Sequence, residues 1–147
     1  MRVVLDTNVF LSALISPHGT ADQIYRTWRA GKFDIVTSLE QLDELRRASR
    51  YPKFKSVLQP TRVGTMIHNL QDAIVLRNLS ILKEADDPND SFLISMCIEG
   101  KADFLVTGDH RAGLIKQKKV AGTRILIPSA FCEKLAKSKH ALSTTPQ

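Results

Sequence analysis

Short apolar runs alternate with stretches of helical periodicity along most of the chain. Residues 2–5 form a β-branched run that predicts a strand, and this run ends at the polar segment 6–8. Apolar residues at helical spacing follow over 9–14, and Thr20 is placed to cap a second helix. Residues 33–36 then predict a second strand. The chain therefore opens as strand, helix, helix and strand.

The middle and the end of the chain continue this alternation. Thr37 and Ser38 are followed three residues later by Glu40 and Gln41, a capping-box spacing that predicts a third helix, which is interrupted at 51–52. Beyond it, the pattern predicts a long amphipathic helix from 60 through 74, a buried helix at 92–98, strands at 102–107 and 123–127, and a final helix from 129 to about 137.

The order of these elements decides the fold class. Mostly apolar strands that alternate with helices favour a parallel sheet with right-handed crossovers and helices on both faces. We expect an α/β domain of three layers, α/β/α, with a central parallel sheet of four or five strands. At 147 residues the chain has room for one such domain. We expect it over 1–137, followed by a disordered C-terminal tail over 138–147.

Composition indicates the environment in which the protein acts rather than its fold. Hydrophobic residues make up 43% of the chain and charged residues 24%, as in ordinary globular domains. No apolar run approaches the roughly 18 residues of a membrane span, and Asp6 interrupts the first apolar stretch, where a signal peptide would stay apolar. We therefore expect a cytoplasmic protein without a membrane anchor, in which Cys97 and Cys132 are buried, reduced thiols.

The charge balance favours an anionic partner. The chain has 21 lysines and arginines against 15 aspartates and glutamates, which gives a formal net charge of +6. Polyanions such as nucleic acids are natural partners of such a protein, although basic clusters are more often simply solvated surface. The cations gather in two clusters, one of Arg46, Arg47, Arg50, Lys53 and Lys55 and one of Lys116, Lys118 and Lys119.

Acidic residues fall where the predicted fold would bring them together. Asp6 and Asp109 each follow a predicted strand directly, and the carboxyl ends of parallel strands share one edge of the sheet. Glu44 borders the apolar stripe of the third helix. Asp90 lies in the first turn of the buried helix if Asp87 caps that helix, and from there it could reach the same edge.

Four carboxylates at one edge favour a bound cation. Two of them about 4 Å apart repel by roughly 4 kcal/mol at an effective dielectric of 20, and a divalent ion offsets this cost. Oxygen ligands without cysteine or paired histidine suit Mg²⁺ or Mn²⁺ rather than zinc. Such an ion can activate a water for attack on a phosphodiester, while the cations Arg46, Arg47, Arg50 and Lys53 neutralise the phosphates of RNA.

These residues resemble the motifs of the PIN-domain ribonucleases, in particular the small prokaryotic PIN proteins that are toxins of toxin-antitoxin pairs. The segments that carry the resemblance are 6–9, 38–45, 87–90 and 104–109, and the match extends from Val3 to about Leu135. The resemblance implies a three-layer PIN-like domain and a Mg²⁺- or Mn²⁺-dependent endoribonuclease. It also implies an antitoxin partner that blocks the site, and a homodimer or higher homo-oligomer.

The resemblance also carries residue roles. It implies that the metal ligands and catalytic residues are Asp6, Glu44, Asp90 and Asp109, and that the supporting residues are Thr7, Asn8, Asp87 and Thr107. The chain departs from the family pattern after Asp109, where it continues with His110 and Arg111 in place of a polar residue and two leucines. This departure leaves the local backbone path and the role of His110 open.

Each acidic residue also has a purely structural explanation. Asp6 could cap the helix that follows it, Glu44 could pair with Arg47, and Asp90 could complement the helix dipole. Asp43 is an alternative to Glu44 in the same helix.

Two other functions compete with the nuclease. One is a PIN-like module that binds RNA without cutting it. The other is a phosphatase of the haloacid dehalogenase type with Asp6 as its nucleophile, which Asn8 argues against because that family needs a second aspartate there.

Overall fold

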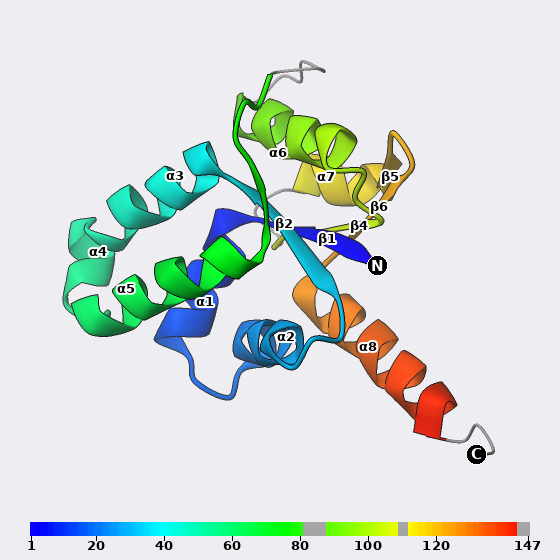
Figure 1. The fold of residues 1–147 in the computed structure, drawn as a ribbon, viewed down its shortest axis with the longest axis horizontal. Coiled ribbons are helices and arrows are strands. Elements are labelled where there is room, and N and C mark those ends of the chain that lie inside the picture. The colour runs from blue at the N-terminus through cyan, green and yellow to red at the C-terminus, as the bar shows by residue number, and fades with distance from the viewer. Residues whose placement is uncertain (81–87, 109–111, 144–147) are drawn as a thin grey trace.

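The computed structural model describes residues 1–80, 88–108 and 112–143 and has one central sheet. Its strand order is β3-β2-β1-β4-β6-β5. Every neighbouring pair is parallel except β5 with β6. The strands are β1 (Arg2–Leu5), β2 (Asp34–Ser38), β3 (Ile74–Leu76), β4 (Phe104–Val106), β5 (Lys119–Val120) and β6 (Thr123–Leu126). Figure 1 shows this sheet crossing the middle of the molecule, with helices on either side.

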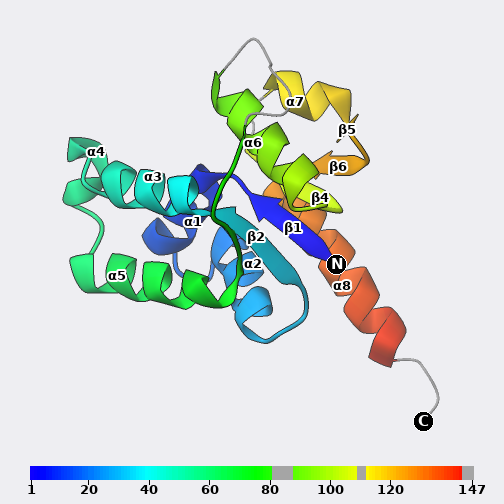
Figure 2. The ribbon, with the colours of Figure 1, turned by 45° about the horizontal axis from the view of Figure 1, so that its top comes forward.

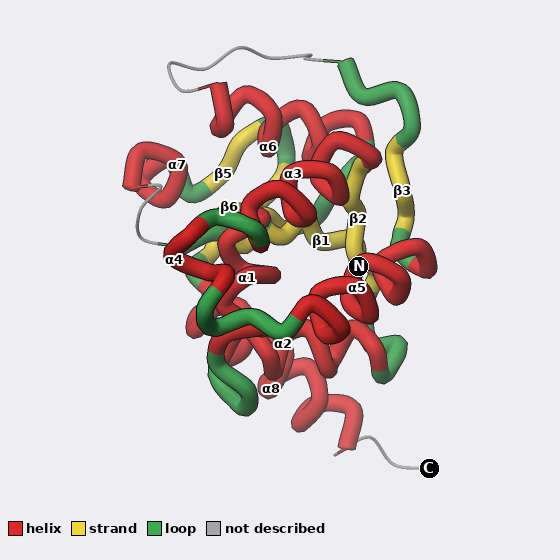
Figure 3. Tube along the Cα trace, turned by 90° about the vertical axis from the view of Figure 1, so that its left-hand side faces the viewer, coloured by secondary structure: helices red, strands yellow, loops and turns green. Residues whose placement is uncertain are grey.

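Helices cover both faces of the sheet, because alternate strand residues point to opposite sides. Val3 and Leu5 of β1 belong to one apolar cluster and Val4 belongs to the other. The first cluster contains residues of α1 (Thr7–Ile15), α2 (Thr20–Arg29), α3 (Leu39–Ser49), α5 (Pro60–Asn69) and α8 (Pro128–Ser143). The second contains residues of α6 (Pro88–Glu99) and α7 (Ala112–Gln117). The three-layer α/β/α class is confirmed, and the side view of Figure 3 shows α6 and α8 on opposite sides of the sheet.

The sheet differs in extent from the sequence expectation. It has six strands rather than four or five, and β5 pairs antiparallel at one edge, so the sheet is only mainly parallel. The other additional strand, β3, takes residues that were expected to end the long helix from 60 through 74. The structure ends α5 at Asn69, and a 3₁₀ turn over Leu70–Asp72 leads into β3. Ile74 falls at helical spacing, but a short β-branched run is equally compatible with a strand.

Two predicted helix ends are also wrong. Gly19, in extended conformation, occupies the cap position of α2, and Thr20 is the first helical residue. The final helix starts at Pro128 and continues to Ser143, past the end expected near Lys137. The capping of α3 by Ser38 is confirmed, because its hydroxyl accepts from the Gln41 N–H at 3.1 Å.

Within the described part of the chain, no helix is both long and apolar enough to cross a bilayer.

The direction of α6 matters for the site. The Ser38 hydroxyl, at the end of β2, lies 3.7 Å from the Met96 sulfur, whereas Gly100 packs against Val36 within the strand. A Cβ atom on Gly100 would lie 2.4 Å from the Val36 side chain, so this close approach requires glycine. The helix therefore runs opposite to the strands, and its first turn projects past the edge where β1, β2 and β4 end. We call this rim of the sheet the carboxyl edge.

Candidate active site at the carboxyl edge

Asp6 is the most deeply placed acidic residue at the carboxyl edge. It follows β1, caps α1 and is 2% exposed. Its carboxylate accepts a hydrogen bond from the Thr107 hydroxyl at 2.8 Å and one from the Asn8 N–H at 3.3 Å. Its own N–H donates to the Val106 carbonyl at 2.9 Å, which joins the ends of β1 and β4. The structure thus brings Asp6 and Thr107 together, although they are 101 residues apart.

Gln41 organises the neighbouring part of the edge, a role that the sequence analysis missed. The side chain is 1% exposed, and its Nε2 donates to the Leu5 carbonyl at 2.7 Å. The same nitrogen lies 3.5 Å from the Thr7 hydroxyl, and Oε1 accepts from the Thr37 hydroxyl at 2.6 Å. Gln41 therefore ties the end of β1 to the end of β2 and to the start of α3.

A sequence signal for Gln41 did exist. It lies four residues before Leu45, so it falls on the buried stripe of α3, where an unpaired amide would be costly. Thr7, expected as a supporting residue, is buried beside this amide, whereas Asn8 is exposed.

Glu44 is half-buried and lies one turn after Gln41 on the same side of α3. Its neighbour Asp43 is exposed and forms an ion pair with Arg47, with 3.2 Å between Oδ2 and Nε. The alternative in which Glu44 only forms an ion pair with Arg47 is therefore wrong, because Arg47 pairs with Asp43 instead. Of the two candidates in this helix, Glu44 is the one turned toward the interior.

Asp90 is half-buried in the first turn of α6. It shares a helix face with Ile94 and Cys97, four and seven residues further on, which are buried against the sheet. The helical rise places it about 9 Å beyond Met96 along the axis, past the end of β2. Asp87, Asp109 and His110 lie outside the described residues.

Comparison with known protein families identifies the family of this chain. A family model described as PIN domain matches residues 2–111. The chain belongs to the PIN domain family. A relative that is 31% identical over 111 residues, the uncharacterized protein MJ1680 of Methanocaldococcus jannaschii, is matched over 74% of this chain and 71% of its own length.

A solved structure has a similar fold at low identity. It is VapBC2 from Rickettsia felis bound to a DNA fragment from their promoter, with a TM-score of 0.53 and 19% identity, over 85% of this chain and 97% of that chain. At this identity the similarity shows the fold alone. PIN domains are generally nucleases that use divalent metal ions, and membership of the family supports this general class of activity.

The acidic side chains expected at the carboxyl edge of the PIN domain carry the kind of donor atom that a hard divalent cation prefers. Asp6, Glu44 and Asp90 offer oxygen atoms, the ligands that Mg²⁺ and Mn²⁺ prefer. Over 1–80, 88–108 and 112–143, no three acidic, histidine or cysteine side chains are close enough to form a ligand set. The joint coordination of one ion by the four predicted carboxylates therefore stays a prediction.

The thiols do not contribute a nucleophile to this edge. Cys97 and Cys132 are both free, as predicted, but only Cys97 is buried and Cys132 is half-buried. Burial raises the pKa of the Cys97 thiol to about 12, so this thiol is neutral near pH 7 and its thiolate is scarce. The Cys132 pKa is also raised by burial.

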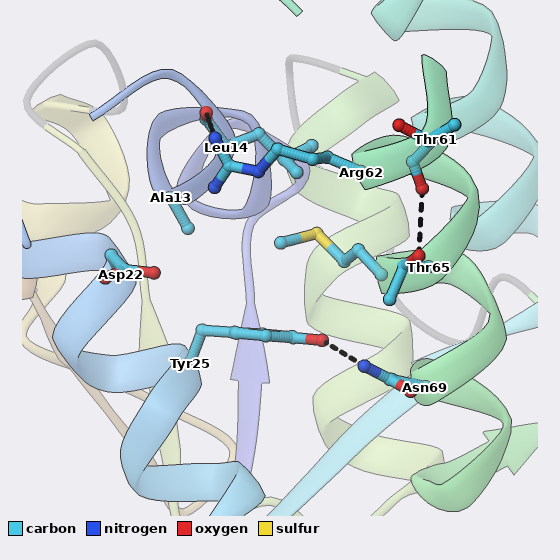
Figure 4. A pocket seen from close by; sticks show the side chains of 9 residues that line it. Ala13, Leu14, Asp22, Tyr25, Thr61, Arg62, Thr65 and Asn69 are labelled. Carbon is cyan, nitrogen blue, oxygen red and sulfur yellow. Dashed lines mark hydrogen bonds between the residues drawn. The ribbon is translucent and has the colours of Figure 1, made fainter. Parts of the chain in front are cut away.

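A hollow of about 240 Å³ lies between α1, α2 and α5 of the PIN domain, away from the predicted ligands (Figure 4). Its buried carboxylate, Asp22, accepts from the His18 N–H at 2.9 Å and pairs with Arg26 at 2.8 Å. Across the hollow, the Asn69 amide donates to the Tyr25 hydroxyl at 3.1 Å. Its acidic group is thus satisfied by neighbouring protein groups, and we assign this hollow a structural role.

Proposed function

We propose that this PIN domain is a Mg²⁺- or Mn²⁺-dependent endoribonuclease that hydrolyses phosphodiester bonds of RNA at the carboxyl edge. The observation that carries the proposal is the buried Asp6 carboxylate, which is held by Thr107 where two parallel strands end. Ligands of open α/β sheets bind at this edge. The residues that would hold the metal are Asp6, Glu44, Asp90 and Asp109.

When bound, the divalent ion would lower the pKa of a water molecule and stabilise the charge that develops on the phosphate. The chain's own residues would fix the geometry for this chemistry. Thr107 and the Asn8 N–H orient the Asp6 carboxylate by hydrogen bonds. Gln41 keeps the first turn of α3 against the end of β1, which sets the position of Glu44 relative to Asp6. Thr7 and Asp87 are proposed as further supporting residues.

We also propose that the protein is the toxin of a toxin-antitoxin pair and acts in the cytoplasm. The similar structure is VapBC2 bound to a DNA fragment from their promoter, which supports an antitoxin as the partner of this chain. Such a partner would block the carboxyl edge, and the toxin would form homodimers or higher homo-oligomers. A neighbouring reading frame for a short DNA-binding protein would support this role.

The direct test is cleavage of a mixed pool of labelled RNAs with Mg²⁺ or Mn²⁺. We expect the wild type to cut and EDTA to abolish cutting. Asp6→Asn should lower the rate at least about a hundredfold, because even groups that only orient a metal ligand cost roughly 10- to 100-fold. Asparagine caps a helix as well as aspartate does, so this variant should keep the fold.

A matched pair of variants in α3 tests the second ligand. Glu44→Gln should reduce cleavage strongly, whereas Asp43→Asn, which removes an exposed carboxylate one position away, should leave cleavage within about twofold of wild type. RNA binding by the wild type without any metal-dependent cutting would contradict the nuclease and favour the non-catalytic binding module.

A further inference from the structure

A second hollow, of about 420 Å³, lies between α3, α4 (Pro52–Lys55) and α5. Figures 1 and 2 show α3 and α5 side by side, with α4 joining them at the end away from the sheet. Its floor contains the buried apolar residues Leu58, Val63 and Ile67. Its charged lining residues are Arg46, Arg50 and Lys55, all exposed. We call this hollow the basic groove.

Within the described residues, the cations of the basic groove have no acidic partner. In the described part of the chain, none of the residues that line the groove is acidic, and neither Arg46 nor Arg50 forms an ion pair. These two arginines are four positions apart, with Arg50 as the C-cap residue of α3, and like charges at this spacing repel by roughly 0.2–0.5 kcal/mol. An anion between them would remove this repulsion.

Two other cations of the same cluster have different surroundings. Arg47 pairs with Asp43 on another side of α3, and the Lys53 ammonium lies 4.9 Å from the centre of the Phe54 ring. Neither lines the basic groove. The structure therefore divides the basic cluster into groove cations and cations that already have a neighbour.

Helix α3 leads from the carboxyl edge to the basic groove. Helix α3 begins at that edge, where Gln41 is bonded to the Leu5 carbonyl, and then passes Glu44 before it reaches the groove. Arg50 lies six residues after Glu44, which is about 9 Å along the helix axis. Arg46 and Arg50 lie about 160° and about 120° around the helix from Glu44. A polymer that passes from the carboxyl edge into the groove would therefore cross over α3.

We propose that the basic groove binds the single-stranded stretch of RNA that flanks the cleaved bond. Arg46, Arg50 and Lys55 would contact backbone phosphates, and the apolar floor would receive an unstacked base or its sugar. This proposal rests on the proposed function, because the occupant is the substrate of the carboxyl edge. The three cations of the lining and the connection through α3 favour a polyanionic RNA strand over an acidic peptide, which the same charges could also attract.

The test measures binding of a short labelled single-stranded RNA by fluorescence anisotropy, in EDTA and over a range of salt concentrations. The groove variant is Arg46→Ala/Arg50→Ala, and the comparison variant Lys32→Ala/Arg77→Ala loses the same charge at exposed positions outside the groove. The groove variant should bind at least about tenfold more weakly and reduce the salt slope by roughly 1.4, about 0.7 for each lost phosphate contact. The comparison variant should stay within about twofold of wild type.

Equal weakening by both double variants would overturn the proposal, since it would mean diffuse charge attraction. It would also be overturned if the groove variant lost binding of a labelled glutamate- and leucine-rich peptide but kept RNA binding. Matching circular dichroism spectra and unfolding midpoints would show that both variants are folded.

A small substrate separates the groove from the carboxyl edge. Hydrolysis of bis(p-nitrophenyl) phosphate with Mn²⁺ needs only the edge, so the groove variant should retain it, and its loss would contradict a separate groove. A wild type that binds RNA through the groove but cuts neither substrate would refute the nuclease and leave the groove assignment standing.

Discussion

Helix α3 contributes to both the carboxyl edge and the basic groove, but the two regions are built by opposite means. At the edge, polar groups are buried and bonded to one another, as in the contacts of Asp6 with Thr107 and of Gln41 with Leu5. In the groove, cations are exposed above an apolar floor. The first turn of α3 is held in place by buried hydrogen bonds, whereas the side chains at the end of the helix are exposed and can contact a binding partner. Substitutions at the edge should therefore cost stability, and substitutions in the groove should cost binding.

The largest stability effect is expected for Gln41→Leu. This change leaves the Leu5 carbonyl and the Thr37 hydroxyl buried without their partner, at about 1–3 kcal/mol each, so the free energy of unfolding should fall by about 2–6 kcal/mol. Urea denaturation measures this loss. Gln23→Leu, which alters an exposed glutamine of α2, is the control and should change stability by less than about 0.5 kcal/mol. A loss below about 1 kcal/mol for Gln41→Leu would contradict the claim that buried hydrogen bonds at the carboxyl edge stabilise the fold.

Thr107→Val should have the next largest effect. It removes a hydrogen bond to the buried Asp6 carboxylate, and bonds to charged groups contribute about 1.5–3 kcal/mol. Chemical denaturation should show a loss in this range. Thr107→Ser keeps the hydroxyl and should retain most of the stability. A valine variant as stable as the wild type would contradict this role of the hydroxyl, because valine keeps the methyl group of threonine and loses only the hydrogen bond.

The sequence predicted the elements that carry strong patterns. β1, β2, β4 and β6 are apolar runs, and the rule that parallel strands end at one edge anticipated that Asp6 would lie beside the end of β4. β3 and β5 were missed for a physical reason. They have three and two residues, so their formation depends on pairing with distant strands rather than on local preference.

At the candidate site, the directions of the side chains were the main feature that could not be predicted from the sequence. Gln41 already had an explanation in the capping-box pattern, which concealed the fact that its amide is buried. Arg46 and Arg47 are adjacent in the sequence, and only the structure shows that one lines a groove while the other pairs with Asp43. The roles of Asp87 and Asp109 stay predictions, because both lie outside the described residues.

The smallest effects are expected for single arginine substitutions in α3. Arg50→Ala removes one member of a like-charged pair and should change the free energy of unfolding by less than about 0.5 kcal/mol, with either no loss or a slight gain. Arg47→Ala breaks an exposed ion pair with Asp43 and should lose about 0.3–0.5 kcal/mol. Parallel denaturation curves compare the two. A loss above about 1 kcal/mol for Arg50→Ala would show that the groove cation has a structural role.

The most direct test of the carboxyl edge is calorimetric titration of the protein with Mn²⁺ in the absence of RNA. We expect saturable binding by the wild type and at least about tenfold weaker binding by Asp6→Asn. Glu40→Gln, which removes an exposed carboxylate at the start of α3, should bind like the wild type. Equal Mn²⁺ affinity of the wild type, Asp6→Asn and Glu40→Gln would contradict a metal site built on Asp6.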